Sequence, residues 1–343
     1  MLLLMRTTQR QRIHVQNFCT WSYVIFFMFV VTACRQERTI IEFFPTEKEL
    51  HGETVSALDS IHNAFSIYWH NEKMYLSTKG DYHLLIYNEK ENKCTKALRR
   101  GHGNNEWMAP MITTQQVIIN GRELSCVLER TSSILYGVNL EDADGSRIFL
   151  KDFRDLRISD ISSIFMLPDS SYWGIKDDNN CRPFRYDDKS GKVIEEEVNI
   201  DESMFSADTH GLSQNLSTYC EQTGKMAIGY YAFPLLVIKD KNQASEDLLI
   251  QIGAFFPTYK KENVAEAHFY ILDVMSTSRY IYLLYDNPDI PDKTSILVFD
   301  WNGAPIAKYT TKRMSCFTVD EKSSRIIALN EDDSEGVCSI YKY

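Results

Sequence analysis

The chain has 343 residues and carries 47 acidic against 37 basic side chains, a formal net charge of −10. Such an acidic chain is not expected to bind nucleic acid, because binding to a phosphate backbone requires clustered Lys and Arg. Hydrophobic residues make up 44% of the sequence, which is enough for a large folded core.

The first 33 residues have the parts of a secretory signal. Arg6, Arg10 and Arg12 form a positively charged segment without acidic residues, and the apolar run Trp21–Val31 follows it. This run is shorter than the about 20 residues that a helix needs to cross a bilayer. We therefore predict a signal peptide at 1–33; a short anchor that is never cleaved is the alternative.

Val31-Thr32-Ala33-Cys34 ends this signal. The tetrapeptide resembles the lipobox of bacterial lipoproteins, in which the signal is cut before the cysteine and the cysteine is lipidated. The resemblance implies a lipidated Cys34, a tether at 34–38 and a membrane as partner. Because Arg35 follows, the aspartate that retains some lipoproteins at the inner membrane is absent. We expect the outer membrane, at either the periplasmic face or the cell surface.

Short runs rich in β-branched and aromatic residues recur along the rest of the chain. Turn residues separate them at intervals of about 8–12 positions, which is typical of an all-β protein. The runs group into units of roughly 40–50 residues, a period typical of a β-propeller. Six such units begin at Phe65, Gln115, Ser162, Leu216, Tyr270 and Cys316.

The sixth unit is one strand short. It contains Cys316–Val319, Arg325–Asn330 and Val337–Tyr341, whereas the others have four runs. Thr39–Phe44 is an unassigned β-rich run near the start of the chain, and it is predicted to complete the last blade and cover its edge. The fold prediction is a single six-bladed β-propeller of four-stranded blades over 39–343, closed by an N-terminal strand.

A glycine-rich segment, Arg99–Trp107, follows the first unit. Gly101, Gly103, Glu106 and Trp107 match a motif of the six-bladed, TolB-like propeller lipoproteins of Bacteroides and related bacteria, which the whole chain resembles; Asn104 stands where that family usually has proline. The resemblance implies a fold and a cell-envelope location but no reaction.

Two interpretations of this segment follow from its chemistry. In the structural one, Gly101 and Gly103 allow a positive φ at a sharp bend between blades. Glu106 then accepts backbone N–H groups, and Trp107 fills the gap between blades. In the functional one, His102 and Glu106, with Trp107 beside them, contact a ligand.

No segment carries a catalytic or metal-binding motif. The sequence lacks a Gly-x-Ser-x-Gly elbow and a His-Glu-x-x-His pair, and its cysteines form no Cys-x-x-Cys pair, so no cofactor or metal is predicted. Cys94, Cys126, Cys181, Cys220, Cys316 and Cys338 are predicted to be mostly buried free thiols. The acidic clusters at 177–178, 195–197 and 331–333 are predicted to be solvated surface, with a calcium loop at 177–180 as the alternative.

A ligand site on a propeller is expected among the loops that connect the blades. The long connectors there are Ser206–Asn215 and Phe255–His268. Tyr and His rings in a concave mouth suit sugars or peptides, because a flat apolar ring with a polar edge stacks on a ligand and forms hydrogen bonds with it at once. The candidate ligand-binding residues of this region are His210, Tyr230, Tyr231, Tyr259, Lys260 and His268.

The sequence therefore favours a monomeric, non-enzymatic binding or scaffold module for an envelope protein or a glycan. The alternative is a hydrolase or lyase at the channel mouth, with one metal held by His210 and His268; a spacer without a ligand is a third possibility. An enzyme should bring His, Asp and Glu side chains together at one mouth, whereas a binding module should present an aromatic or apolar patch.

Overall fold

The computed structural model describes residues 38–61, 63–103, 105–141, 146–154, 161–176, 181–196, 212–241, 247–259, 265–331 and 336–343. Thr39–Tyr343 forms one compact unit. The predicted signal, its alternative as an anchor, and Cys34 all lie outside the described residues. In the parts that are described, no helix combines the length and the apolar character needed to cross a membrane.

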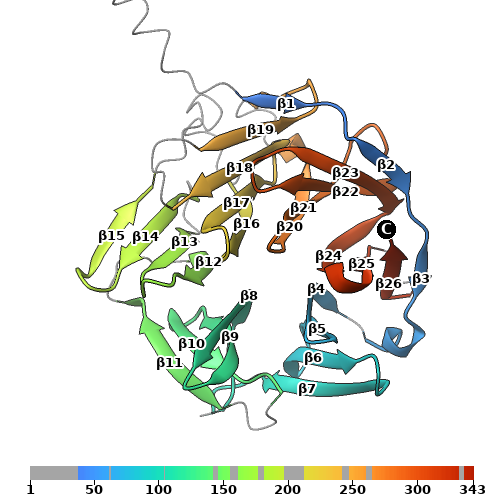
Figure 1. The fold of residues 1–343 in the computed structure, drawn as a ribbon. Helices are drawn as coiled ribbons and strands as arrows, with labels where there is room; N and C mark the ends of the chain where they lie inside the picture. Colours follow the sequence, from blue (N-terminus) through green and yellow to red (C-terminus); the bar gives the residue numbers. More distant parts are fainter. Residues whose placement is uncertain are drawn as a thin grey trace, which may run out of the picture. The chain divides into compact units, whose positions relative to one another are not determined.

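Six antiparallel sheets arranged in a ring confirm the predicted six-bladed propeller (Figure 1). In blades 1 to 5 the four strands follow chain order from the inner strand to the outer one, and inner strands of neighbouring blades contact each other at most of the junctions between blades. Blade 1 consists of β4 (Ala64–His70), β5 (Lys73–Thr78), β6 (Tyr82–Asn88) and β7 (Lys93–Arg99). Blade 2 consists of β8 (Pro110–Ile119), β9 (Arg122–Glu129), β10 (Ile134–Val138) and β11 (Arg147–Asp152). Blade 3 consists of β12 (Ile161–Met166), β13 (Tyr172–Lys176), β14 (Pro183–Asp187) and β15 (Lys192–Glu195).

The second half of the ring repeats this pattern. Blade 4 consists of β16 (Asn215–Cys220), β17 (Lys225–Tyr230), β18 (Leu235–Asp240) and β19 (Leu248–Ile252). Blade 5 consists of β20 (Ile271–Ser276), β21 (Tyr280–Tyr285), β22 (Lys293–Asp300) and β23 (Pro305–Lys312). Blade 6 consists of β24 (Met314–Asp320), β25 (Arg325–Asn330), β26 (Cys338–Lys342) and β3 (Gly52–Thr54), with the short 3-10 helices η1 (Ser56–Leu58) and η5 (Glu321–Ser323) beside it in the chain.

The strand that closes the ring is not the predicted one. β3 pairs antiparallel with β26 and supplies the missing outer strand of blade 6. The predicted closing run, Thr39–Phe44, instead contains β1 (Thr39–Ile41), which adds a parallel fifth strand to blade 4. β2 (Thr46–Glu49) adds a parallel strand to blade 5. The N-terminal segment thus follows the outer edges of blades 4, 5 and 6 in turn.

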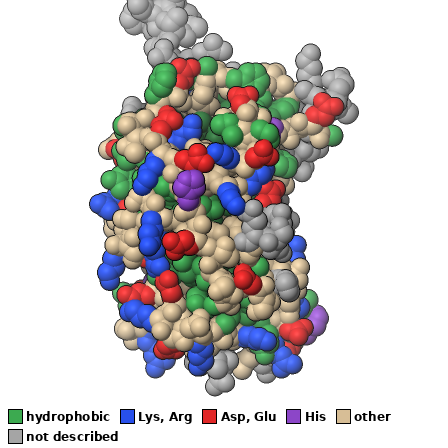
Figure 2. Space-filling view, turned by 90° about the vertical axis from the view of Figure 1, so that its right-hand side faces the viewer, with side chains coloured by type: hydrophobic (Ala, Val, Ile, Leu, Met, Phe, Trp, Pro, Cys, Tyr) green, Lys and Arg blue, Asp and Glu red, His purple; other side chains and the backbone are tan. Residues whose placement is uncertain are grey.

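The side of the ring that carries β2 and β3 has charges of both signs. Figure 2 shows Lys and Arg interspersed with Asp and Glu on this side, with hydrophobic side chains between them. Some of these charges pair across strands, as Lys293 does with Glu49 at 2.7 Å. Such interspersed charges favour solubility rather than the steering of a charged ligand.

The core lies between the blades. The middle strands are buried on both faces because each blade packs between two others; β22, for example, is buried throughout Thr294–Phe299. Trp107, Trp173 and Tyr282 are among the largest fully buried side chains. The six cysteines of the described chain are free thiols, five of them buried and Cys94 exposed.

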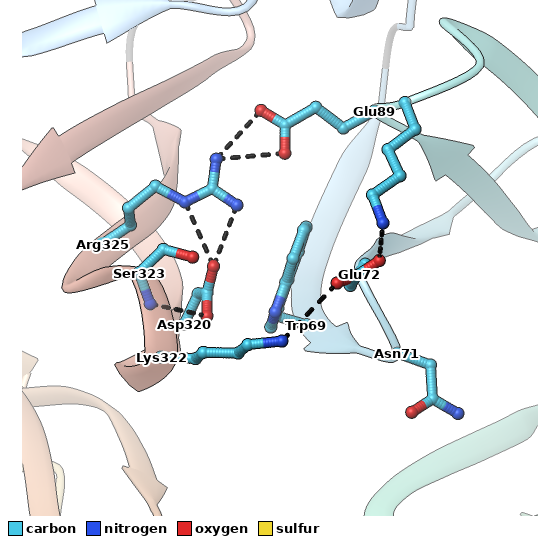
Figure 3. Close-up of a pocket in the computed structure, with 9 residues that line it drawn as sticks. Trp69, Asn71, Glu72, Glu89, Asp320, Lys322, Ser323 and Arg325 are labelled. Atoms are coloured by element: carbon cyan, nitrogen blue, oxygen red, sulfur yellow. Dashed lines mark hydrogen bonds and ion pairs between the residues drawn. The ribbon is translucent and has the colours of Figure 1, made fainter.

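Blades 6 and 1 are connected by the chain itself, which runs from β3 of blade 6 to β4 of blade 1, and also by side-chain contacts across the seam between them. Arg325 donates to both carboxylate oxygens of Glu89, at 2.9 and 3.0 Å, across 236 residues of sequence. The backbone N–H of Trp69 donates to the Thr318 hydroxyl at 2.9 Å. Figure 3 shows Arg325, Glu89 and Trp69 at the end of the seam where the β4–β5, β6–β7 and β24–β25 hairpin loops lie.

Candidate functional site

The connector from blade 1 to blade 2 forms a tight, self-contained turn. The Gly103 N–H donates to Glu106 Oε2 at 2.9 Å, and the Gly101 N–H donates to the Trp107 carbonyl at 3.1 Å. Gly101 has a φ of +154°, and a Cβ there would lie 2.0 Å from Glu106 Oε2. Gly103 does not have the predicted positive φ; it is small because a Cβ would approach Glu106 Oε2 to 3.1 Å.

Trp107 fills the gap between blades 1 and 2, as the structural interpretation predicts. It is 1% exposed and meets Tyr136 edge to face at a centroid distance of 5.6 Å. His102 is exposed on the same turn, while the Glu106 carboxylate is bonded to the backbone and lies 3.5 Å from Arg99. His102, Glu106 and Trp107 are therefore close in sequence but differ in environment: His102 is exposed, Glu106 is bonded to the backbone and Trp107 is buried.

The connector from blade 4 to blade 5 gathers the other predicted rings. The Tyr259 hydroxyl donates to the Ala232 carbonyl at 3.0 Å, and its ring meets Phe233 edge to face at 5.5 Å. The backbone N–H of Tyr270 donates to the Tyr231 carbonyl at 2.6 Å. Tyr231 and Tyr259 therefore lie on one side of the ring, which we call the connector face because the blade-to-blade connectors form it.

Tyr230, a predicted ligand-binding residue, lies in the core and not on the surface. It is 3% exposed, and its side chain belongs to the core between blades 3 and 4. Burial raises the pKa of this tyrosine far above its usual value. β17 is buried from Met226 to Tyr230, whereas Tyr231 follows it in the loop before β18 and is half-buried. His210 and Lys260, the other predicted residues of this region, lie outside the described residues.

Two exposed phenylalanines on the same connector were not among the predicted residues. Phe255 is 70% exposed and Phe269 is 53% exposed. Phe269 meets Tyr231 edge to face at 6.1 Å, and Phe256, next to Phe255, stacks on Phe233 at 5.4 Å. The only sequence signal for them is the aromatic pairs Phe255-Phe256 and Phe269-Tyr270, one near each end of the connector.

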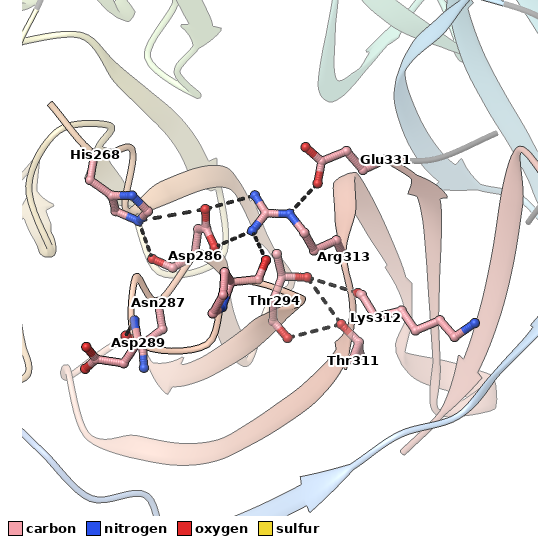
Figure 4. A network of polar contacts seen from close by, with 10 residues as sticks. His268, Asp286, Asn287, Asp289, Thr294, Thr311, Lys312, Arg313 and Glu331 are labelled. Carbon is pink, nitrogen blue, oxygen red and sulfur yellow. Dashed lines mark hydrogen bonds and ion pairs between the residues drawn. The ribbon is translucent and has the colours of Figure 1, made fainter. Parts of the chain in front are cut away.

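A paired polar network lies beside these rings (Figure 4). Arg313 donates to both carboxylate oxygens of Asp286, at 3.1 and 3.0 Å, and also pairs with Glu331. His268 Nε2 donates to the Asp286 carbonyl at 3.0 Å. A metal at His268 would therefore have to take Nδ1. Within the described ranges, no three His, Cys, Asp or Glu side chains are placed to hold a metal ion.

One carboxyl on an inner strand has an unusual environment. Asp273 accepts the backbone N–H groups of Val274 at 2.8 Å and of Phe317, from blade 6, at 3.1 Å. Burial raises the pKa of Asp273 to about 6, more than these hydrogen bonds lower it. Its ionised form is therefore less favourable in the folded protein than in the unfolded chain.

This shift predicts a pH-dependent stability. An acid whose pKa is about 6 when folded and about 3.9 when unfolded lowers stability as pH rises between these values. The contribution to the free energy of unfolding should fall by up to about 2 kcal/mol from pH 4 to pH 7. Urea unfolding at pH 4.5 to 7 should show a smaller fall in stability with rising pH in Asp273→Asn than in the wild type. Equal slopes in both proteins would contradict the assignment.

The acidic cluster at 195–197 is predicted to be solvated surface, but the structure shows that Glu196 is not. Glu196 is partly buried and accepts the indole N–H of Trp173 at 2.9 Å, and desolvation raises its pKa. Lys239 lies 4.0 Å from it. Glu196 therefore has a structural role between blades 3 and 4. The predicted calcium alternative at 177–180 lies outside the described residues.

Comparisons with known proteins bear on the fold. No protein-family model matches the chain, and no curated protein matches it in sequence. Among solved structures, it is similar to an exported protein from Bacteroides fragilis, with 13% identity over 88% of this chain and 98% of the other and a TM-score of 0.51. It is also similar to a DUF4221-family protein from Bacteroides vulgatus, with 12% identity over 86% and 97% of the two chains and a TM-score of 0.55. The chain shares the fold of these Bacteroides proteins.

Proposed function

We propose that the protein is a lipid-anchored propeller of the bacterial outer membrane that binds an envelope protein or a glycan without catalysing a reaction. The export signal and the lipobox support the location. The binding surface is the connector face of blades 4 and 5. The observation that carries the proposal is the exposure of Phe255 and Phe269, with the Phe269 ring in contact with Tyr231.

The arrangement around these two rings suits binding better than catalysis. Asp286, Arg313 and His268 have partners within the fold, so none of them is held ready to transfer a proton. Phe269 is supported by Tyr231, which reduces the freedom that a partner would have to remove. Burying one phenylalanine in an interface contributes about 1.5–3 kcal/mol, so two such rings suffice as the centre of a binding surface.

The proposal is tested by recovering the partner from solubilised native membranes with a tagged protein. The variants are Phe255→Ser with Phe269→Ser, and the control Phe149→Ser, which changes a 60% exposed ring on β11 of blade 2. Removing both rings should lower recovery at least tenfold, equivalent to about 1.4 kcal/mol, while the control should match the wild type. Equal recovery with all three proteins would refute the connector face as the binding surface.

A further inference from the structure

The hairpin-loop end of the seam between blades 6 and 1 contains a pocket of about 590 Å³. This volume falls in the range of small-molecule sites. The pocket lies on the opposite side of the ring from the connector face, because the loops between the first and second strands and between the third and fourth strands of a blade lie opposite the connectors. Its lining comes from the β4–β5, β6–β7 and β24–β25 loops and consists of Trp69, Asn71, Glu72, Glu89, Lys90, Asp320, Lys322, Ser323 and Arg325.

The charged groups of the pocket compensate one another. Arg325 donates to Glu89 at 2.9 and 3.0 Å and to Asp320 at 2.9 Å. Glu72 pairs with Lys90, and Lys322 Nζ lies 3.8 Å from its other oxygen. Three acidic and three basic side chains thus line the pocket, and all six take part in these ion pairs. An ionic ligand would have to break an existing pair, which disfavours phosphates, carboxylates and free cations.

Trp69 supplies a flat, fixed apolar surface. The Arg325 guanidinium lies over its ring, 5.0 Å from the centroid, and the backbone of Trp69 is bonded to Thr318 of blade 6. Figure 3 shows the ring edge-on, with Arg325 on one side and Glu72 on the other. The ring is therefore held in place before any ligand arrives, which lowers the entropic cost of binding.

Two neutral polar atoms in the pocket have unused hydrogen-bonding capacity. The indole N–H of Trp69 donates to no acceptor among the residues that the structure describes. Asn71 donates its amide N–H to Glu123 at 3.1 Å, while its carbonyl oxygen receives no hydrogen bond within that same part of the chain. Together with the Ser323 hydroxyl, these atoms provide neutral donors and acceptors beside an aromatic ring.

We propose that this pocket binds a neutral saccharide of one to three pyranose units. A pyranose ring has an apolar C–H face that packs on an indole, and hydroxyl groups that donate and accept at once. Such hydroxyls can donate to a carboxylate and accept from the paired ammonium or guanidinium without separating the two charges. The paired walls, the fixed Trp69 ring and the free donor and acceptor all match this chemistry.

Calorimetric titration with maltose, cellobiose, lactose and N,N′-diacetylchitobiose tests the assignment, with glucose 6-phosphate as the charged comparison. The full mature protein is used, carrying Cys34→Ser for solubility. At least one disaccharide should bind with a Kd of ~1 mM or below. Trp69→Ala should weaken it at least tenfold, Trp69→Phe less, and Asn71→Ala measurably. Phe149→Ala, an exposed ring on blade 2, should bind like the wild type.

Trp69→Ala also removes a ring that supports the seam, so each variant is first checked for a cooperative unfolding transition like that of the wild type. Asn71→Ala and Trp69→Phe keep the test decisive if Trp69→Ala does not fold. The assignment is refuted if no disaccharide binds at about 20 mM, if the Trp69 and Asn71 variants bind unchanged, or if glucose 6-phosphate binds more tightly than every disaccharide. Its failure leaves the connector face untouched, since that surface is tested with different residues.

Discussion

Cys34→Ser is expected to release the protein from the membrane fraction into the soluble fraction of the cell envelope. Lipid anchoring contributes about 0.8 kcal/mol for each methylene group buried in the bilayer, so two acyl chains hold a protein on a membrane almost permanently. Serine has no thiol to acylate, and no helix in the described part of the chain is long and apolar enough to cross a membrane. Cells are grown with a radioactive fatty acid and then fractionated, which measures both the lipidation and the location of the protein.

The matched control is Cys94→Ser, which replaces the exposed cysteine of β7 in blade 1. This variant should stay in the membrane fraction and keep its fatty-acid label. If Cys34→Ser remained labelled and membrane-bound, the lipobox interpretation would be wrong and the uncleaved anchor would take its place.

Trp107→Ala is expected to lower the free energy of unfolding by about 3–5 kcal/mol. Trp107 is 1% exposed, and its ring contacts Tyr136 and lies 5.1 Å from the Arg147 guanidinium. Its removal leaves a cavity between blades 1 and 2. The connector turn does not easily move into this cavity, because hydrogen bonds at Gly101 and Glu106 hold it in place. Equilibrium unfolding in urea measures the loss.

Phe149→Ala is the control, because it removes an aromatic ring of blade 2 that is 60% exposed. It should change stability by no more than about 0.5 kcal/mol. A loss below about 1 kcal/mol for Trp107→Ala would show that the motif does not hold the two blades together and would reopen its interpretation as a ligand-contacting segment.

The blade pattern could be predicted from sequence because each strand carries its own signal. β22 contains the apolar run Ile296–Phe299 and is followed by a turn with Gly303 in a positive-φ conformation. The closing strand β3 carries no such signal. Its three residues, Gly52–Thr54, are all exposed, and it is held by backbone pairing to β26 rather than by buried side chains. Hydrophobic pattern therefore favoured the more apolar Thr39–Phe44.

The candidate sites were predicted less well than the fold, for two physical reasons. Tyr230 and Tyr231 are neighbours in sequence, but Tyr230 ends a buried strand and Tyr231 lies in the loop that follows. The sequence alone does not show where the strand ends. The saccharide pocket is assembled when the ring closes, because Trp69 and Arg325 are more than 250 residues apart in the chain. No local pattern around either residue indicates that they will meet.

Photo-cross-linking in native membranes shows directly whether a partner binds the connector face of blades 4 and 5. A photoreactive phenylalanine analogue replaces Phe269 on the connector face or, in the control protein, Phe149 on blade 2. We expect a discrete adduct from position 269 and none from position 149. Adducts of the same pattern from both positions, or no adduct from position 269, would contradict a partner-binding surface at blades 4 and 5.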